Sequence, residues 1–517
     1  AAAMHLGASP FSVYNTYSAP QIEHLAGDAE SRVVVTERAF LETIRKATQQ
    51  SEYLEHIVVV DGEGEGGTLT LDDVEARAED GFDFEAAWRA VEPDDVLTLI
   101  YTSGTTGPPK GVQISHANLL AASRSFDELI QFGQGARVVS YLPMAHIAER
   151  SCTQYLPMAF GFSTTDCPDP RQIAAYLPEV RPTWWFSVPR VWEKLKAGLE
   201  ASFAAEEDEN RKQAVAWALD VGRRRVRAEQ AGEELSNELG EEHAKADAMV
   251  LSKIRERIGL DQLEACNVGA APTPPETIEF FHAIGVPLAE LWGMSETCGA
   301  GTCNRPGHIK IGTVGQASPG VEISLAEDGE LLMRSDVVML GYRNMPEQTA
   351  ETIDAEGWLH TGDVAEIDDE GFVKIVDRKK ELIISAAGKN MSPANIEAKL
   401  KAAGPLIGQA VCIGDARQYN VALITIDPDM APGFAKQHGI AESSPDRLVD
   451  EPAVLEQIQK EVDDANADLA RVEQIKRFTI LRQEWEPGGD ELTPTMKLKR
   501  KPIAEKYAGE IEALYDG

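Results

Sequence analysis

Short runs of β-branched residues alternate with stretches of helical spacing through the first half of the chain. Val33–Val35 and Ile57–Val60 have the length and composition of buried strands, and the segment 39–50 between them has the spacing of an amphipathic helix. A third apolar run, Val96–Ile100, leads directly into a loop rich in glycine and threonine. This alternation predicts an α/β domain.

Two further segments have the pattern of helices. Ser115 is a suitable N-cap, because its hydroxyl can accept from an amide in the first turn of a helix over 116–129. Residues 204–260 are dense in Glu, Arg, Lys and Ala, with apolar residues at helical spacing, which predicts a surface pair of amphipathic helices. Their mixed charges indicate a solvated face rather than a binding site.

From Val314 the pattern changes to short strands and tight turns. After Asp377 it changes again, because the charged segment 377–381 precedes a smaller α+β stretch that runs to the end of the chain. The turns close on glycines, which tolerate a positive φ. These glycines are Gly329, Gly357 and Gly371.

The 517 residues are too many for one ordinary core, so at least two domains are expected. We predict an α/β protein with a large N-terminal domain of layered sheets and helices, 1–379, and a small mobile α+β C-terminal domain, 380–517. The chain opens on Ala1 without an initiator methionine, and a helix-like start runs straight into Gly7. We interpret this as a large domain that lacks its first segment.

The composition narrows the range of partners. Lys and Arg number 49 and Asp and Glu number 85, for a net charge of −36, which would repel a nucleic acid. No run approaches the ~18 apolar residues that a membrane-spanning helix needs, and the first residues lack the pattern of a signal peptide. We expect a cytoplasmic protein without a transmembrane segment. Peripheral contact with a membrane and the oligomeric state are left open.

The most distinctive segment is the glycine- and threonine-rich loop 101–111, Tyr-Thr-Ser-Gly-Thr-Thr-Gly-Pro-Pro-Lys-Gly. A strand, such a loop and then a helix form a common architecture for holding phosphate, because glycines allow close backbone approach while amides and hydroxyls donate. Lys110 adds a positive charge. The P-loop NTPase motif is excluded, because Pro109 stands where that motif needs glycine and Gly111 where it needs Ser or Thr.

Together with Val112, this segment closely resembles the phosphate-binding signature of the adenylate-forming superfamily. That superfamily includes acyl-CoA synthetases, firefly luciferase and the adenylation domains of peptide synthetases, and further motifs in its order extend the resemblance over nearly the whole chain. The resemblance implies that the loop binds the phosphates of ATP and that Thr102 also serves Mg²⁺. The residues it assigns are Thr102, Ser103, Gly104, Thr105, Thr106, Gly107 and Lys110.

Two later motifs are assigned to the adenine and the phosphates by the same resemblance. The aromatic ring of Trp292 would stack on adenine, Ser295 would contact phosphate, and Glu296 would hold Mg²⁺, a cation that favours carboxylate oxygen. Trp stands here in place of the commoner Tyr, and Ser in place of Thr. The full motifs are Gly269-Ala270-Ala271-Pro272 and Trp292-Gly293-Met294-Ser295-Glu296.

The ribose is assigned to Asp363 and Arg378. A carboxylate suits the two ribose hydroxyls, because it offers two acceptor oxygens and no donor. Arg378 resembles a second ribose contact that acts as a donor. Lys380 falls at the family's hinge, about which the small domain pivots.

The C-terminal motif Leu-Thr-Pro-Thr-Met-Lys ends at Lys497 and resembles the motif of the catalytic lysine. The transition state of adenylation spreads negative charge over the α-phosphate, and a cation placed there stabilises it more than it stabilises the reactants. Lys499, Arg500 and Lys501 follow closely, so the sequence leaves the register within this basic cluster open, although the Thr-Pro-Thr context favours Lys497.

The segment 142–150 resembles the motif at the acyl end of the site, where His146 would lie near the substrate carboxylate and the α-phosphate. Glu149 and Arg150 are interpreted as a structural ion pair. Together with the segment Val188–Lys194, this motif looks like the long-chain fatty acyl-CoA synthetases, so a fatty acid is the expected substrate.

The CoA step rests on the segment 385–393, which in the family swings to the active site after adenylation. Gly388 would leave room for the pantetheine arm of CoA. The chain is therefore expected to convert a fatty acid, ATP and CoA into acyl-CoA, AMP and pyrophosphate. The alternatives left open are a fatty acyl-AMP ligase without the CoA step, luciferase-type oxygenation, and a truncated, non-catalytic homologue that binds nucleotide or acyl groups.

Overall fold

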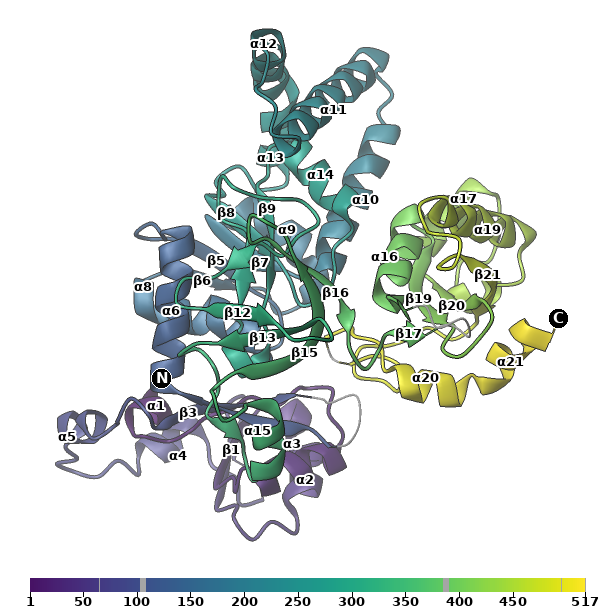
Figure 1. The fold of residues 1–517 in the computed structure, drawn as a ribbon. Coiled ribbons are helices and arrows are strands. Elements are labelled where there is room, and N and C mark those ends of the chain that lie inside the picture. Colours follow the sequence, from purple (N-terminus) through teal and green to yellow (C-terminus); the bar gives the residue numbers. More distant parts are fainter. Residues whose placement is uncertain (65, 103–107, 385–389, 494, 517) are drawn as a thin grey trace.

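The computed structural model describes residues 1–64, 66–102, 108–384, 390–493 and 495–516. A central body carries an N-terminal lobe at its base, a helical arm at the opposite end and a C-terminal domain at its side (Figure 1). The N-terminal lobe, the body and the C-terminal domain all contain sheets, whereas the arm is entirely helical.

The N-terminal lobe contains both strands that the sequence predicts, and they pair in parallel. They are not both buried as expected, because Val33 and Val35 are 52% and 62% exposed. The expected helix over 39–50 begins as a 3₁₀ turn and continues to Thr48. The elements are α1 (Ala2–His5), α2 (Ala19–Asp28), β1 (Val33–Thr36), α3 (Leu41–Thr48), β2 (His56–Val59), α4 (Leu71–Glu75) and α5 (Phe84–Arg89).

The glycine-rich loop joins two strands, and the second of them, which the sequence analysis did not predict, lies between the loop and the expected helix over 116–129. Strands β3 (Val96–Thr102) and β4 (Lys110–Ser115) pair antiparallel, and the short strand β14 (Gly341–Tyr342) pairs with β4. Val112 and Ile114 are fully buried, and these β-branched residues favour an extended chain. The expected N-cap is confirmed at the end of β4, where α6 (His116–Ile130) begins and the Ser115 hydroxyl accepts from the Asn118 amide.

A five-stranded sheet forms the centre of the body. Three of its strands run parallel, and two antiparallel strands extend it at one edge. Both faces pack into large apolar clusters. The strands are β7 (Trp184–Ser187), β8 (Ala265–Val268), β9 (Leu288–Trp292), β10 (Thr302–Cys303) and β11 (Gln316–Ala317). The flanking elements include β5 (Arg137–Ser140), α7 (Ile147–Arg150), the π-helix η2 (Ser151–Tyr155), α8 (Leu156–Phe160), β6 (Ser163–Asp166), α9 (Ile173–Val180), α10 (Pro189–Ala204) and α14 (Pro275–Ala283).

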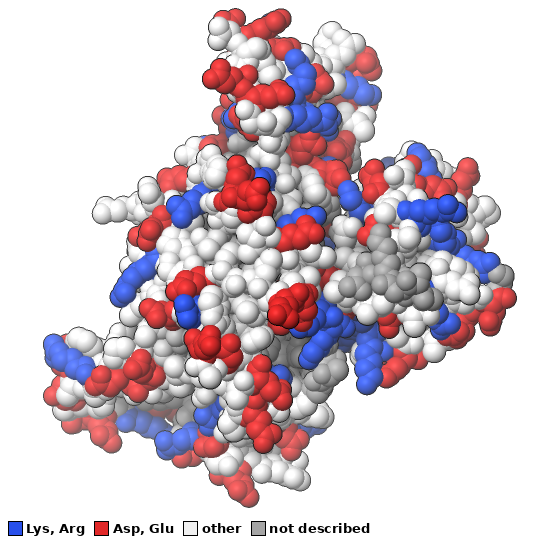
Figure 2. All heavy atoms as spheres, in the orientation of Figure 1, with Lys and Arg blue, Asp and Glu red and all other residues white. Residues whose placement is uncertain are grey.

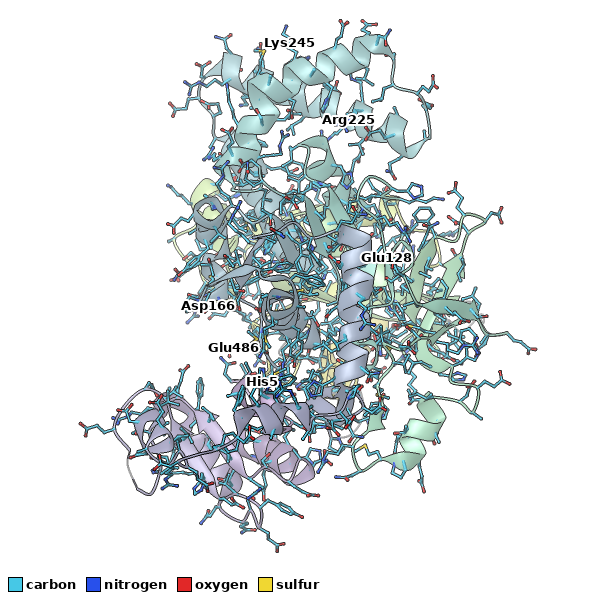
Figure 3. The ribbon with its side chains drawn as sticks, turned by 90° about the vertical axis from the view of Figure 1, so that its left-hand side faces the viewer. His5, Glu128, Asp166, Arg225, Lys245 and Glu486 are labelled. Carbon is cyan, nitrogen blue, oxygen red and sulfur yellow. The ribbon has the colours of Figure 1, made fainter. Side chains whose placement is uncertain are left out.

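The expected surface pair of helices is confirmed as the helical arm. The first is α11 (Glu209–Gln230), and the second runs through α12 (Asn237–Ala246), η4 (Asp247–Leu251) and α13 (Ser252–Arg257). Arg225 and Lys245 mark the arm in Figure 3, far from Glu128 on α6 and from the N-terminal lobe. Salt bridges such as Arg224–Glu242 join the two helices, which fits the reading of a solvated surface.

The strands and glycine turns predicted after Val314 form a four-stranded antiparallel sheet. Gly329, Gly357 and Gly371 all adopt φ values between 82° and 84°, which confirms the expected turns. The strands are β12 (Glu322–Leu325), β13 (Glu330–Arg334), β15 (Leu359–Ile367) and β16 (Val373–Arg378), and α15 (Pro346–Thr352) lies between β14 and β15.

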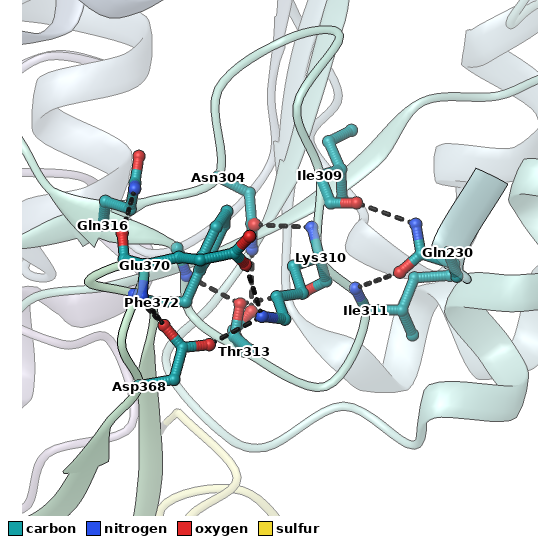
Figure 4. A network of polar contacts seen from close by, with 11 residues as sticks. Gln230, Asn304, Ile309, Lys310, Ile311, Thr313, Gln316, Asp368, Glu370 and Phe372 are labelled. Atoms are coloured by element: carbon teal, nitrogen blue, oxygen red, sulfur yellow. Dashed lines mark hydrogen bonds and ion pairs between the residues drawn. The ribbon is translucent and has the colours of Figure 1, made fainter. Parts of the chain in front are cut away.

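The loop 304–315 joins this sheet to the central sheet and to the arm (Figure 4). Lys310 binds Asp368 at 2.7 Å and Glu370 at 2.8 Å, both in the turn after β15. Gln230 at the end of α11 donates to the Ile309 carbonyl oxygen at 2.8 Å. The loop is thus fixed from two sides.

The C-terminal domain is built on a three-stranded sheet covered by helices, with its own apolar core. This is the α+β organisation that the sequence predicts. Its elements are β17 (Ile383–Ile384), β18 (Asn390–Met391), α16 (Pro393–Ala403), β19 (Ile407–Ile413), β20 (Asn420–Ile426), α17 (Ala431–Gln437), α18 (Pro445–Leu448), α19 (Pro452–Ala467), β21 (Ile475–Leu481), α20 (Arg500–Lys506) and α21 (Ala508–Asp516).

The acidic charge is spread over the surface. Figure 2 shows Asp and Glu side chains scattered across the visible face, with Lys and Arg among them. No helix in the described part of the chain combines the length and apolar character needed to cross a lipid bilayer.

Candidate functional site

The two ends of the glycine-rich loop are held side by side. Thr102 at the end of β3 pairs with Lys110 at the start of β4. Lys110 also places its Nζ 4.7 Å from the centre of the Tyr342 ring. Of the loop residues predicted to bind phosphate, Thr102 and Lys110 are described, whereas Ser103, Gly104, Thr105, Thr106 and Gly107 lie outside the described residues.

Tyr342 links this end of the loop to Glu296. Its hydroxyl donates to Oε1 of Glu296 at 2.7 Å, and both side chains are buried. Burial and the neighbouring carboxylate raise the pKa of Tyr342 above its ordinary value, so the phenol remains a donor at neutral pH. Sequence reasoning missed Tyr342. Its only local signal is the preceding Gly341, which adopts a φ of 145°.

The carboxylate of Glu296 fits the role predicted for it. Proteins commonly hold Mg²⁺ through one or two carboxylates, while substrate phosphates and water complete the shell. Within the described ranges, no group of three or more His, Cys, Asp or Glu side chains is arranged to hold a metal. Glu296 could hold the metal together with the phosphates of a bound nucleotide.

The two motifs assigned to adenine lie at the same edge of the central sheet. The turn 269–272 follows β8, and the segment 292–295 begins at the last residue of β9. The neighbouring strands β8 and β9 run parallel. Carboxyl ends of parallel strands meet at one edge, which is where ligands bind in many α/β proteins. A Cβ added at Gly269 would lie 2.9 Å from Cδ1 of Leu291, so the backbone approaches β9 closely. The described positions in these motifs are Gly269, Ala270, Ala271, Pro272, Trp292, Gly293, Met294 and Ser295.

The carboxylate of Asp363 on β15 is contacted from two elements. The indole Nε1 of Trp292 donates to its Oδ2 at 2.8 Å, and Nε of Arg378 on β16 contacts its Oδ1 at 2.8 Å. Burial raises the pKa of Asp363, while Arg378, Trp292 and Lys497 counter that shift. The predicted ribose pair is therefore in contact, and the predicted adenine residue Trp292 touches it.

Lys497 reaches this group from the C-terminal domain. Lys497 is an exposed residue, yet protein surrounds its ammonium group closely enough that desolvation lowers the pKa of Lys497. Arg378 lowers this pKa further, whereas Asp363 and Glu296 in the body and Glu381 oppose the shift. Besides burial, residues predicted for the ribose and the metal thus act on the charge of Lys497.

Neighbours of Lys497 in the basic cluster have other partners. The ammonium group of Lys499 donates to the Gly489 carbonyl oxygen at 2.7 Å, and Arg500 forms a two-pronged ion pair with Glu397 at 2.6 and 2.8 Å. Both contacts stay within the C-terminal domain. This arrangement favours the register that places Lys497 at the site.

His146, the residue predicted at the acyl end, lies close enough to Lys497 for the charge of the lysine to act on it. It caps α7, and its Nδ1 accepts from the Ala148 amide at 3.2 Å. Burial and the charge of Lys497 lower the pKa of His146 to about 4. The imidazole is therefore neutral at pH 7.

Glu149 and Arg150 do not form the ion pair that the sequence suggested. Oε1 of Glu149 accepts from the Ser140 hydroxyl at 2.6 Å, whereas Nη1 of Arg150 donates to the Thr98 hydroxyl at 2.8 Å. Adjacent residues on a helix point in different directions, so their side chains reach different neighbours. Both are structural, in separate networks.

Ion pairs join the C-terminal domain to the body. Arg190 and Lys194 lie one turn apart on α10, within the segment 188–194, and bind Asp427 and Asp429 respectively. On α16, Lys399 binds Glu276 of α14 at 2.8 Å. Gly388, predicted to admit CoA, lies outside the described residues.

Residues 1–343 match the family described as AMP-binding enzyme, and residues 380–517 match the AMP-binding enzyme C-terminal domain. The chain belongs to the AMP-binding enzyme family. This confirms the resemblance to the adenylate-forming superfamily inferred from the motifs.

Among its relatives in the AMP-binding enzyme family are two proteins of Mycobacterium tuberculosis. The protein named "Putative fatty-acid–CoA ligase fadD11" is 55% identical over 450 residues, which cover 87% of this chain and 79% of that protein. The long-chain-fatty-acid–CoA ligase FadD15 is 35% identical over 528 residues, which cover 100% of this chain and 85% of that protein.

Solved structures of other AMP-binding enzymes share the fold. The adenylation domain of a carboxylate reductase from Mycobacterium chelonae superposes with a TM-score of 0.73 at 21% identity, covering 100% of this chain and 78% of that one. The anthranilate CoA ligase AuaEII, in complex with anthranoyl-AMP, gives 0.69 at 20% identity, with 99% and 84% covered. The predicted fold class, a large α/β domain followed by a smaller C-terminal domain, is confirmed.

Proposed function

We propose that this AMP-binding enzyme is a fatty-acid–CoA ligase that forms AMP. A fatty acid and ATP give acyl-adenylate and pyrophosphate, and CoA then displaces AMP to give acyl-CoA. The observation that carries this proposal is the buried carboxylate of Asp363, which contacts Trp292 and Arg378 while Lys497 of the other domain is near enough to act on its pKa. The names of the two mycobacterial relatives support the substrate class.

In the first step, a carboxylate oxygen of the fatty acid attacks the α-phosphorus of ATP and pyrophosphate leaves. Negative charge grows on the α-phosphate oxygens, and Lys497 is the catalytic residue that stabilises it. His146 stays neutral, so it can donate one hydrogen bond at the acyl end without holding a second cation there.

The nucleotide-binding assignments follow the sequence motifs. The loop 102–107 and Lys110 bind the phosphates, the turn 269–272 and residues 292–295 hold the adenine, and Asp363 and Arg378 bind the ribose. Glu296 and Thr102 would hold Mg²⁺, which neutralises phosphate charge when bound. Tyr342 orients the Glu296 carboxylate.

For the second step, we place the boundary of the large domain after Lys379, with Lys380 as the hinge. The Arg190–Asp427 and Lys194–Asp429 ion pairs belong to the arrangement that brings Lys497 to the site. A turn of the C-terminal domain would break them and bring the segment that contains Gly388 to the thioester-forming position.

A long acyl chain is the substrate we favour. The segments 142–150 and 188–194 resemble those of long-chain enzymes, and the relative that spans this whole chain is named a long-chain-fatty-acid–CoA ligase. A panel of saturated acids from short to long, assayed by AMP release, tests this choice. Activity that peaks on short or aromatic acids would contradict it.

The deciding experiment for the reaction is ATP–pyrophosphate exchange with palmitate, followed by thioester formation after CoA is added. Exchange and thioester are both expected. Exchange without thioester would assign the chain as an acyl-AMP ligase. The absence of exchange from folded protein would reduce it to a binding homologue.

A further inference from the structure

Two side chains contact the carboxylate of Asp363, one on each oxygen. The indole N–H of Trp292 donates to Oδ2 at 2.8 Å, and the guanidinium group of Arg378 forms an ion pair with Oδ1, with its Nε at 2.8 Å. Trp292 is 9% exposed and Asp363 is 4% exposed. Since the hydrogen bond and the ion pair come from different strands, β9 and β16, they fix the rotation of the carboxylate on β15.

The indole itself is held in place by backbone. Trp292 pairs with Thr302 on β10, and Gly301 lies directly against the ring. A Cβ added at Gly301 would come within 2.6 Å of Cε3 of Trp292, so even this one atom does not fit. The N–H therefore approaches Asp363 from a direction that the fold sets.

This arrangement leaves a defined number of free acceptor positions. A carboxylate offers about four lone-pair sites. Trp292 uses one site on Oδ2 and the ion pair with Arg378 lies on Oδ1, so each oxygen keeps at least one acceptor site. The 2′- and 3′-hydroxyls of a ribose are two adjacent donors, which match two such acceptors.

We propose that Trp292 is a positioning residue for the nucleotide, whose indole N–H orients Asp363 to accept from both ribose hydroxyls of ATP. This inference rests on the proposed function and deepens it. It gives Trp292 a task that differs from stacking on adenine. Any aromatic ring supplies a face for stacking, but among Trp, Phe and Tyr only Trp supplies this N–H.

The electrostatics give a second consequence. Burial raises the pKa of Asp363, and the Trp292 hydrogen bond is one of the contacts that hold it down. Loss of the N–H would raise this pKa further, so protonation would begin at a higher pH. A protonated carboxyl has one acceptor fewer for the ribose.

The test compares ATP with 2′,3′-dideoxyATP in pyrophosphate exchange by the full chain with palmitate. Trp292→Phe keeps the aromatic face and removes the donor. We expect it to lower kcat/KM for ATP about tenfold, the effect of one hydrogen bond to a charged group. The value for dideoxyATP should change less than about twofold, because that nucleotide has no hydroxyl for Asp363 to bind.

The matched control is Trp184→Phe, which removes another buried indole N–H, the donor to Oδ1 of Asn267 at 2.9 Å. Trp184→Phe should leave the ratio of kcat/KM for ATP to kcat/KM for dideoxyATP unchanged. Trp292→Tyr serves as a second variant if Trp292→Phe does not fold. Both Trp292 variants should also move the acidic limb of kcat/KM for ATP to higher pH.

Equal losses with both nucleotides, or no loss with either, would overturn the inference while leaving the proposed function intact. An unmoved acidic limb would overturn it as well. Failure of the unaltered chain to exchange pyrophosphate with ATP would instead contradict the proposed function itself.

Discussion

The hydroxyl of Tyr342 donates to Glu296 at 2.7 Å while the ring of the same residue lies 4.7 Å from Nζ of Lys110. One aromatic side chain thus contacts both the residue proposed to hold Mg²⁺ and the lysine that ends the phosphate loop. Partners that orient a metal ligand influence metal affinity strongly.

Tyr342→Phe should therefore weaken the response to Mg²⁺. The variant keeps the ring near Lys110 and removes the donor to Glu296, so we expect the Mg²⁺ concentration for half-maximal exchange to rise about tenfold. Tyr515→Phe is the control, because it removes a hydrogen bond to the Ile413 carbonyl oxygen in the C-terminal domain. A change in fatty-acid KM with an unchanged Mg²⁺ response would refute the role of Tyr342.

Lys497→Ala should separate the two half-reactions. We expect pyrophosphate exchange to fall by about 100-fold or more, because the charge that develops on the α-phosphate loses its cation. Thioester formation from supplied palmitoyl-AMP should be largely spared. Lys501→Ala, at an exposed neighbour, is the control. Equal losses in both half-reactions would show that Lys497 has a different role.

Arg190→Ala should also affect the first half-reaction selectively. The substitution strips buried Asp427 of its ion-pair partner in the arrangement that brings Lys497 to the site. We expect exchange to fall about three- to tenfold, with no fall in thioester formation from supplied acyl-AMP. Lys194→Ala removes a far more exposed pair and should cost about twofold or less. A loss confined to the thioester step would reverse the assignment of these ion pairs.

His146 should contribute a pH dependence to stability. Its pKa is about 4 in the folded chain against about 6.5 when unfolded, so between these values the unfolded state binds more protons. Stability from this residue is therefore present above pH 6.5 and is lost as the pH falls towards 4. His146→Asn keeps an N-cap and removes the titration, so its urea midpoint should fall less between pH 7 and pH 5.

Exposed His438→Asn is the matched control for that comparison. It should show the same fall in urea midpoint as the unaltered chain. If His146→Asn also followed the unaltered chain, the neutral state of this buried imidazole would be ruled out as a source of the pH dependence.

Features that depend on short stretches of chain were predictable from the sequence. Ser115 caps its helix, and Gly329, Gly357 and Gly371 close their turns, because the residue type alone favours that backbone. The order of the motifs was enough to identify the family.

Features that depend on distant neighbours were not predictable. The segment after the glycine-rich loop is a strand because Val112 and Ile114 pair with β3 and are buried there. Glu149 and Arg150 separate because Ser140 and Thr98 are better placed partners. The contact of Trp292 with Asp363 joins residues 71 positions apart, and no local pattern indicates it.

The loop 304–315, drawn in Figure 4, affects how the body unfolds locally. The Asn304 amide donates to the Glu290 carbonyl oxygen on β9, and the Val314 amide donates to the Val373 carbonyl oxygen on β16. Lys310 forms an ion pair in the turn after β15. Hydrogen bonds and an ion pair through this loop therefore connect the strands that carry Trp292 and Asp363. They should open as one cooperative unit, with amides on β9 and β15 exchanging their hydrogens at similar free energies.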